Sequence, residues 1–312
     1  MGSKRGATPR SLRCRPSLDY TLVTMRRAVI DIGTNTVKLL VADVLQAQVV
    51  TIVAEDRTTR LGEGVDGQKR LAQAAIARTI QAVNEFQAEA KALGAVDIIA
   101  LTTSAARDAV NRDEFLDGVR QACGLEVKLI SGEREAELIY RGVSSDPEWS
   151  GEPILVVDVG GGSAEFIQGR GGRMELFQSL PLGALRLTEK FGEGKFGELC
   201  DHLRATLGPA LARYEAKGRR LIGTGGTITT VARMLHGPVD HATISHETLG
   251  SLLQRLEAMT VAERKKVDGL PPERADIIVA GGAVFLVVMA VLDADELTVS
   301  VRNLRYGALV AG

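Results

Sequence analysis

Cysteine is nearly absent from the sequence: 312 residues contain only Cys14, Cys123 and Cys200, which lie far apart. No two of them have the spacing of a zinc-binding pair or of a Cys-x-x-Cys redox motif. An odd, sparse count is typical of a reducing compartment, so we expect a cytoplasmic protein. Aromatic residues are also scarce, at 4% of the chain, and Val, Leu, Ile and Ala must therefore fill the core.

The sequence also has almost no net charge and no long apolar run. The formal net charge of −1 argues against a general coat for nucleic acid. A local basic groove for an anionic ligand stays possible, because a sum over the chain hides clustering. No uninterrupted apolar stretch reaches the ~18 residues of a membrane span. The longest, residues 277–292, contains two glycines and is interpreted as a buried strand, turn and helix. We therefore expect neither nucleic acid nor a membrane as a partner.

Residues 1–24 differ in composition from the rest. They are polar, with five Lys or Arg and two prolines, and they lack the apolar core of a secretion signal. We interpret them as a disordered N-terminal extension, or as an upstream start that is not the natural one, in preference to a targeting peptide.

Two halves of the chain open in the same way. Residues 27–44 have the pattern of strand, tight turn and strand, and residues 154–168 repeat it after a linker-like segment at 144–153. Helices are expected over residues 71–93 and 133–142. Three pairs of residues correspond at a constant offset of 127: Asp31 with Asp158, Gly33 with Gly160, and Thr36 with Ser163. The repeat predicts two related α/β domains, over 25–147 and 151–312, whose first hairpins face each other across a cleft.

The three glycines in LVVDVGGGSAEF allow three interpretations: a linker, a dinucleotide loop or an anion-binding turn. A dinucleotide loop opens a helix, whereas these glycines lead into the strand-like AEFIQG, and a Walker A loop is absent. Flanking strands argue against a linker. Glycine lets the backbone approach a phosphate and reach left-handed angles, and successive N–H groups then form a nest for anionic oxygens. A plain glycine-rich hairpin stays the alternative, which the matching turn DIGTNT makes less favoured.

Two further features add to the anion-binding interpretation. Asp158 would repel a bare phosphate, so its place in the turn suits a nearby divalent cation or a polarised water. A third glycine turn, GTGG at 223–226, precedes a helix-like stretch, and the N-terminus of a helix attracts anions. A close turn between strand and helix is the alternative for that segment.

Taken together, seven motifs in this order resemble the exopolyphosphatase and guanosine pentaphosphate phosphohydrolase family, which has the actin, sugar-kinase and Hsp70-like ATPase fold. They are AVIDIGTNTVKLLVADV, TTSAARDAVN, LISGEREAELIYRGV, LVVDVGGGSAEFI, SLPLGALRLTEKF, LIGTGGTITTVARM and RADIIVAGGAV. The resemblance implies an α/β fold with two ribonuclease H-like domains around a central cleft. It also implies release of terminal phosphate from inorganic polyphosphate or pppGpp, in the short, two-domain form of the family.

The resemblance also implies a role for individual residues. The first phosphate turn is matched by Gly33, Thr34, Asn35 and Thr36, together with Asp31, and the second by Gly160, Gly161, Gly162 and Ser163, together with Asp158 and Glu165. Arg107 matches an arginine near the reacting phosphate, and Lys38 falls where some relatives place a basic residue. Glu135 matches the catalytic glutamate.

Physical reasoning supports these roles without deciding them. A carboxylate such as Glu135 can orient a water molecule and take its proton, although pattern alone does not choose it over Glu133 or Glu137. Arg107 can bind two phosphate oxygens, or pair with Asp108 or Asp113. Lys38 has a solvated strand face as its alternative. Three acids, Asp31, Asp158 and Glu165, could hold Mg²⁺ or Mn²⁺ that neutralises phosphoryl charge.

We therefore expect metal-dependent hydrolysis of the terminal phosphate of polyphosphate. Hydrolysis of pppGpp to ppGpp is the first alternative, and a sugar or acetate-type kinase of the same fold is the second. A regulator that binds without catalysis is disfavoured, since binding needs no base. A homodimer is left open. The sequence departs from the family where Glu137 replaces an arginine and where Tyr306 replaces an acid in the C-terminal motif.

Overall fold

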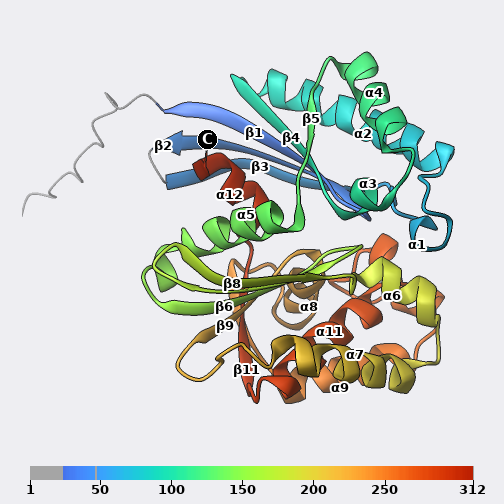
Figure 1. The fold of residues 1–312 in the computed structure, drawn as a ribbon, viewed down its shortest axis with the longest axis vertical. Helices are drawn as coiled ribbons and strands as arrows, with labels where there is room; N and C mark the ends of the chain where they lie inside the picture. Colours follow the sequence, from blue (N-terminus) through green and yellow to red (C-terminus); the bar gives the residue numbers. More distant parts are fainter. Residues whose placement is uncertain (1–23, 46–47, 312) are drawn as a thin grey trace, which may run out of the picture.

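The computed structural model describes residues 24–45 and 48–311 (Figure 1). The extension expected at residues 1–24 therefore lies, except for residue 24, outside the described residues. The fold is α/β with two mixed sheets in two domains, as expected. Within the described ranges, no helix is long and apolar enough to cross a membrane.

The first sheet has the strand order β3-β2-β1-β4-β5. Strands β1 to β3 are antiparallel neighbours, while β4 and β5 continue parallel to β1. Its strands are β1 Met25–Ile32, β2 Thr36–Leu45, β3 Gln48–Thr58, β4 Asp97–Thr102 and β5 Val127–Leu129. Its helices are α1 Val65–Gln68, α2 Gln73–Ala92, α3 Ser104–Asp108, α4 Arg112–Cys123 and α5 Gly132–Ser144. Gly94, with a φ of 83°, follows α2 where the sequence predicts the helix to end.

The second sheet has the order β10-β11-β9-β6-β7-β8 and repeats the antiparallel opening hairpin followed by parallel strands. Its strands are β6 Pro153–Val159, β7 Ala164–Arg170, β8 Arg173–Leu180, β9 Arg220–Thr224, β10 His241–Ser245 and β11 Glu296–Ser300. Its helices are α6 Ala184–Phe191, α7 Phe196–Leu211, α8 Gly226–His236, α9 His246–Glu257, α10 Val261–Arg264 and α11 Ile278–Val291, followed by α12 Leu304–Ala311. Short 3-10 turns lie at Pro147–Trp149 and Pro272–Arg274.

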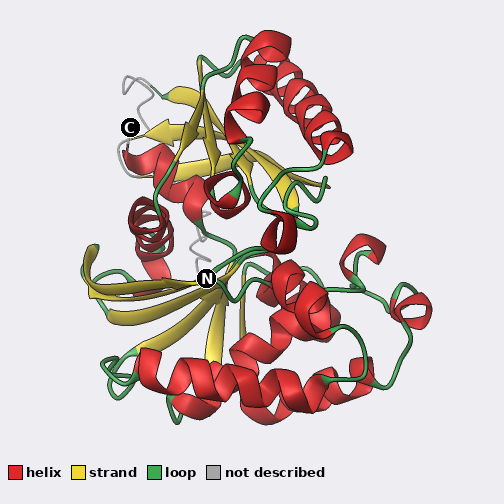
Figure 2. Ribbon diagram, turned by 45° about the vertical axis from the view of Figure 1, so that its right-hand side comes forward, coloured by secondary structure: helices red, strands yellow, loops and turns green. Residues whose placement is uncertain are grey.

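Helices α5 and α12 lie between the two sheets and pack against each other (Figures 1 and 2). Two glycines let their backbones touch, because a Cβ at Gly142 would lie 2.1 Å from the Asn303 carbonyl oxygen and one at Gly307 only 1.8 Å from that of Leu138. Helix α12 also contacts β1, β2 and β3, so the last helix of the chain returns to the first sheet. The boundaries at residues 147 and 151 stay a prediction.

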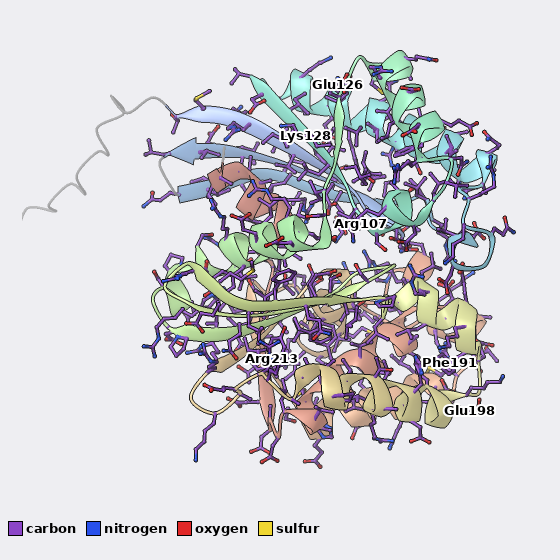
Figure 3. All side chains as sticks on the ribbon, viewed as in Figure 1. Arg107, Glu126, Lys128, Phe191, Glu198 and Arg213 are labelled. Carbon is purple, nitrogen blue, oxygen red and sulfur yellow. The ribbon has the colours of Figure 1, made fainter. Side chains whose placement is uncertain are left out.

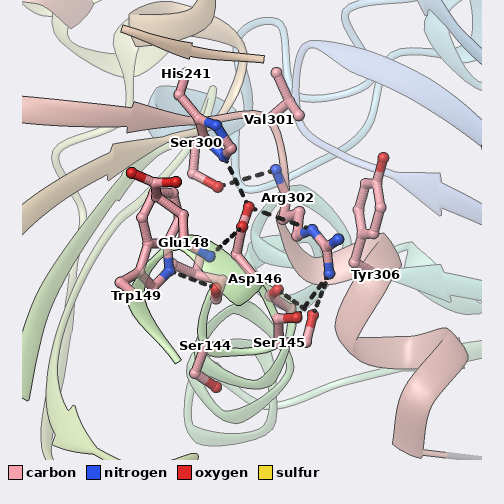
Figure 4. A network of polar contacts seen from close by, with 12 residues as sticks. Ser144, Ser145, Asp146, Glu148, Trp149, His241, Ser300, Val301, Arg302 and Tyr306 are labelled. Atoms are coloured by element: carbon pink, nitrogen blue, oxygen red, sulfur yellow. Dashed lines mark hydrogen bonds and ion pairs between the residues drawn. The ribbon is translucent and has the colours of Figure 1, made fainter. Parts of the chain in front are cut away.

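The segment 144–153 joins α5 to β6 and contains a 3-10 turn, and two of its residues, Asp146 and Trp149, are buried, which its linker-like composition does not indicate. Trp149 is 1% exposed and donates its indole N–H to the Val143 carbonyl at 2.8 Å (Figure 4). Asp146 accepts from His241 Nε2 at 2.9 Å and lies 3.4 Å from Arg302 Nε. Arg302 belongs to the second crossing between the sheets, which joins β11 to α12. Arg302 Nη1 also donates to the Ser145 carbonyl at 2.9 Å, so partly buried polar contacts join the two crossings.

Residues 277–292 do not form a strand, turn and helix: the sequence prediction is wrong here. Helix α11, Ile278–Val291, runs through the segment without a break. Its two glycines serve helix packing, because a Cβ at Gly281 would lie 2.8 Å from the Thr227 side chain and one at Gly282 would lie 2.5 Å from that of Leu253. The helix is buried on nearly every side, which removes the polar face that marks a surface helix.

Candidate active site

Two hairpin turns face each other, and each contains the same hydrogen bond. The Gly33 N–H donates to the Thr36 carbonyl at 3.1 Å between β1 and β2, and the Gly160 N–H donates to the Ser163 carbonyl at 3.0 Å between β6 and β7. The two turns thus have matching geometry at the offset of 127 residues that the internal repeat predicts.

Glycine at positions 161 and 162 is required by the close approach of the two turns. A Cβ at Gly161 would lie 2.9 Å from the backbone nitrogen of Asn35, and one at Gly162 would lie 2.6 Å from the hydroxyl oxygens of Thr34 and Ser104. None of the three glycines at 160–162 has a positive φ, so the expectation of left-handed angles is wrong. The absence of a side chain matters here for space between backbones.

The N-terminus of α6 holds the carbonyl groups of the second turn. Backbone N–H groups of Ala184 and Leu185 donate to the carbonyls of Gly160 and Gly161 at 2.9 and 3.0 Å. The third carbonyl, that of Gly162, accepts from the Arg186 side chain, as described below. In a trans peptide the carbonyl and the following N–H point in opposite directions. The N–H groups of residues 161–163 therefore point away from α6.

The first turn is held in the same way by residues 59–62. The Gly62 N–H donates to the Thr34 carbonyl at 2.8 Å, and the Arg60 N–H donates to the Asn35 carbonyl at 2.9 Å. The N–H groups of Asn35 and Thr36 accordingly point away from that segment. Each domain thus presents outward-facing N–H groups to the space between the turns.

Strand pairing places four charged side chains beside these turns. Asp31 lies opposite Lys38 in the β1–β2 ladder, and Asp158 lies opposite Glu165 in the β6–β7 ladder. Lys38 and Glu165 thus occupy equivalent places in the repeat, so the first turn carries an acid and a base and the second carries two acids. Lys38 lines the same cavity as Asp31 and Asp158, and its positive charge opposes the rise in the pKa of both acids.

Burial raises the pKa of all three acids at the turns. The pKa of Asp158 rises to about 6, mainly because of burial, and the neighbouring Asp31 carboxylate adds to the rise. Burial also raises the pKa of Asp31. The pKa of Glu165 lies well above its ordinary value because of burial and repulsion from Glu135 and Asp158. Such a group of crowded, desolvated carboxylates favours binding of protons or cations.

Glu135 lies in the first turn of α5, a helix whose N-cap Ser131 accepts from the Arg134 N–H at 3.2 Å. Its carboxylate accepts from Arg107 Nη1 at 2.8 Å, and its side chain is 10% exposed. Burial raises the pKa of Glu135 to about 7, against the lowering effect of Arg107. Asp31 and Asp158 raise it further, so this carboxylate shares the field of the acids at both turns.

Arg107 and Glu137 clarify alternatives that the sequence leaves open. Arg107 lies at the end of α3, on the side of the first domain that faces the second (Figure 3). It pairs with Glu135, and Asp108 pairs instead with Arg186. Glu137 forms ion pairs with Arg134 at 2.6 Å and Arg141 at 2.8 Å on the outer face of α5. It is therefore a surface acid, whereas Glu135 faces the cleft.

The residues expected to bind phosphate, apart from Arg107, line one cavity of about 70 Å³ together with Asp31, Asp158, Glu165 and Glu135. The third glycine turn joins them through Gly226 and Thr227 at the start of α8. Gly225, with a φ of 89°, lets that turn approach the acids, because a Cβ there would lie 2.1 Å from Asp158 Oδ1. Arg107 reaches the site through its contact with Glu135.

Arg274 and its neighbours are site residues to which the sequence assigns no role. The Arg274 guanidinium lies over Gly226, and Arg274 lines both the small cavity and an adjoining cavity of about 660 Å³. The larger cavity also contains Arg233, Arg305 and Asp56. The motif RADIIVAGGAV begins with Arg274, but nothing in its spacing indicates that the side chain reaches another segment's glycine turn.

The acids at the turns fit a magnesium ion that keeps several of its water ligands. Among the described residues, no three His, Cys, Asp or Glu side chains are placed to enclose a metal ion by themselves. Mg²⁺ is usually held by one or two carboxylates with waters and substrate phosphates. Asp31 and Asp158, from the two turns, would hold it with Glu165 nearby, and the buried Oδ1 of Asn35, which has no hydrogen-bond partner, lines the same cavity.

Comparisons with known proteins show the family of the chain. The chain matches a family model described as the Ppx/GppA phosphatase family over residues 40–311. Exopolyphosphatase 1 of Mycobacterium tuberculosis is 32% identical over 301 residues, which cover 92% of this chain and 88% of that protein. The crystal structure of an exopolyphosphatase from Cytophaga hutchinsonii has a TM-score of 0.84 at 28% identity, and the match covers 91% of this chain and 96% of that one.

A further relative has a different named activity. A guanosine-5'-triphosphate,3'-diphosphate pyrophosphatase of Vibrio atlanticus is 29% identical, with 90% of this chain matching 58% of that protein. The family model and the relatives show an enzyme of the phosphoanhydride hydrolase class. The chain belongs to the Ppx/GppA phosphatase family.

Proposed function

We propose that this protein is an exopolyphosphatase, which hydrolyses the terminal phosphoanhydride bond of inorganic polyphosphate. The observation that carries the proposal is the position of Glu135. Its buried carboxylate lies beside Arg107 in a cavity lined by outward-facing N–H groups of two turns. A terminal phosphoryl group fits a site of this kind, because the nests and Arg107 stabilise negative charge.

Glu135 acts as the general base in this proposal. Its pKa of about 7 leaves it largely deprotonated at slightly alkaline pH, where it takes a proton from the attacking water. Arg107 fixes the carboxylate by a hydrogen bond of 2.8 Å and adds positive charge beside the phosphoryl oxygens. Asp31 and Asp158, with Glu165 nearby, would hold Mg²⁺ or Mn²⁺, and the bound ion would neutralise phosphoryl charge.

The larger adjoining cavity supports a substrate that extends beyond one phosphate. It opens beside Gly226 and carries the three arginines Arg233, Arg274 and Arg305. A polyphosphate chain presents a negative charge at every phosphate, which suits several guanidinium groups in succession.

Hydrolysis of pppGpp is the second candidate function. The volume of about 660 Å³ in the adjoining cavity has room for a nucleoside, and the Vibrio relative is named for that activity. Family membership among phosphatases disfavours the kinase alternative. A cytoplasmic location, suggested by the cysteine count, and a homodimer stay predictions.

Parallel assays separate the two substrates. We expect phosphate release from medium-chain polyphosphate with Mg²⁺, little release with EDTA, and a lower kcat/KM for pppGpp. A kcat/KM for pppGpp that exceeds the polyphosphate value would replace the first candidate with the second.

A further inference from the structure

Arg186 connects the second phosphate turn to the opposite domain. Its Nε donates to the Gly162 carbonyl at 2.9 Å, so this side chain completes the set of α6 contacts that turn the N–H groups outward. Its two other nitrogens cross the cleft, Nη1 to Asp66 in α1 and Nη2 to Asp108 in α3, the latter at 2.5 Å. The side chain is 14% exposed despite spanning two domains.

The contact with Asp108 lies next to the pair formed by Arg107 and Glu135. Asp108 follows Arg107 in the short helix α3, and Arg107 pairs with Glu135 at 2.8 Å. Whatever fixes Asp108 therefore also fixes the helix that presents Arg107. Arg186 is thus bonded at one end to the turn that would bind phosphate and at the other to the helix that orients the base.

Arg60, in the first domain, forms the reverse connection to the second domain. The Arg60 backbone N–H donates to the Asn35 carbonyl of the first turn, and its side chain reaches Asp276 in the second domain at 2.7 Å. Arg60 also donates to the Glu273 carbonyl at 3.2 Å. Each segment that holds a phosphate turn thus carries an arginine that bonds to the opposite domain. A further cross-cleft bond joins the Gly64 N–H to Glu189 at 3.0 Å.

We propose that Arg186 is a positioning residue that couples closure of the cleft to the assembly of the site. When the domains close, Asp66 and Asp108 accept hydrogen bonds from its two terminal nitrogens, while Nε of the same guanidinium donates to the Gly162 carbonyl. The glycine turn and Arg107 therefore reach their working positions together. The inference rests on the proposed hydrolysis at Glu135 and concerns how that site is completed.

Three variants test the coupling. Arg186→Met removes both ends of the connection, Asp66→Asn with Asp108→Asn removes the cross-cleft partners alone, and the third variant combines all of these substitutions. Misplacing catalytic groups by about 1 Å can cost about 100-fold in rate, so we expect Arg186→Met to lower kcat/KM for polyphosphate by about 10- to 100-fold. The two aspartate substitutions should give much of that loss.

The combined variant distinguishes coupling from separate structural roles. Residues that act as one unit are not additive, so we expect it to be no worse than Arg186→Met. Losses that multiply, or aspartate substitutions that leave kcat/KM unchanged, would overturn the inference. Arg204→Gln is the matched control, because Arg204 pairs with Asp201 on the exposed face of α7, so its loss should leave activity unchanged. Melting temperatures of all variants check that they fold.

Small-angle X-ray scattering provides a readout that needs no substrate. We expect the variant with both aspartate substitutions to have a larger mean radius of gyration than the wild type, because the closed form has lost its cross-cleft bonds. An unchanged radius would overturn the coupling even if the enzyme hydrolyses polyphosphate. An increased radius in a protein that fails to hydrolyse polyphosphate would contradict the proposed function and leave the closure contact standing.

Discussion

The substitution Glu135→Gln should make the metal-free protein more stable at alkaline pH. Burial raises the pKa of Glu135 from 4.5 to about 7, so the folded protein favours the protonated carboxyl group. Above pH 7 the folded state must hold the charge, and at 1.36 kcal/mol per unit of pKa this costs about 3 kcal/mol. Glutamine has the shape of the protonated acid and never ionises, so the variant avoids that cost.

The sign of the pH dependence follows from the same shift. Between pH 4.5 and about 7 the unfolded chain has released this proton while the folded protein still holds it, so stability falls as pH rises. Wild type and Glu135→Gln should therefore be equally stable near pH 4.5 and should differ most above pH 8. The variant also removes the repulsion that raises the pKa of Glu165, which acts in the same direction.

Thermal unfolding in EDTA at pH 4.5 and pH 8.5 measures the difference. A stabilisation of about 3 kcal/mol corresponds to a rise in Tm of roughly 5 °C or more for a chain of this size. Glu137→Gln is the matched control on the same helix, and it should lower Tm slightly because the Arg134 and Arg141 pairs lower the pKa of Glu137. A Glu135→Gln variant that melts at or below the wild type at pH 8.5 would refute the reasoning.

Three further predictions follow from the site and the fold. The kcat/KM for polyphosphate should fall about tenfold per pH unit below the Glu135 pKa. Arg107→Gln should move this acidic limb of the pH–rate profile to higher pH, because Arg107 lowers the pKa of Glu135. An acidic limb at the wild-type position would contradict the pairing. Mg²⁺ should raise the Tm of the wild type at pH 8.5, and Asp158→Asn should reduce that rise. Gly307→Ala should cost about 3 kcal/mol in urea unfolding, since its Cβ would overlap the Leu138 carbonyl, and a cost below about 1 kcal/mol would show that α5 and α12 move apart freely.

Local patterns allowed much of the fold to be predicted. The apolar strands on either side of DIGTNT and of DVGGGS are contiguous in sequence. The two hairpins and the similarity of their turns could therefore be expected from the sequence. The helix in segment 277–292 could not be predicted, because a helix buried on nearly every side has no polar face and its sequence shows no helical period. The composition of 144–153 suggested a linker, but the burial of Trp149 depends on contacts made by distant residues.

The candidate site was predicted in part for the same reason. Residues within the glycine turns could be found because each turn is contiguous in sequence. Arg274 and Arg186 act through contacts with residues about 50 and 80 to 120 positions away, and such contacts exist only once the chain has folded. The choice of Glu135 over Glu137 came from family resemblance, and the structure adds the physical distinction of a cleft-facing and a surface carboxylate.

Steady-state hydrolysis of polyphosphate by Glu135→Gln tests the central claim most directly. With saturating Mg²⁺ and medium-chain polyphosphate, loss of the general base should lower kcat by about 10²- to 10⁴-fold. Glu137→Gln, on the outer face of the same helix, should stay within about twofold of the wild type, because exposed ion pairs contribute little. A Glu135→Gln enzyme that releases phosphate at close to the wild-type rate would contradict the account.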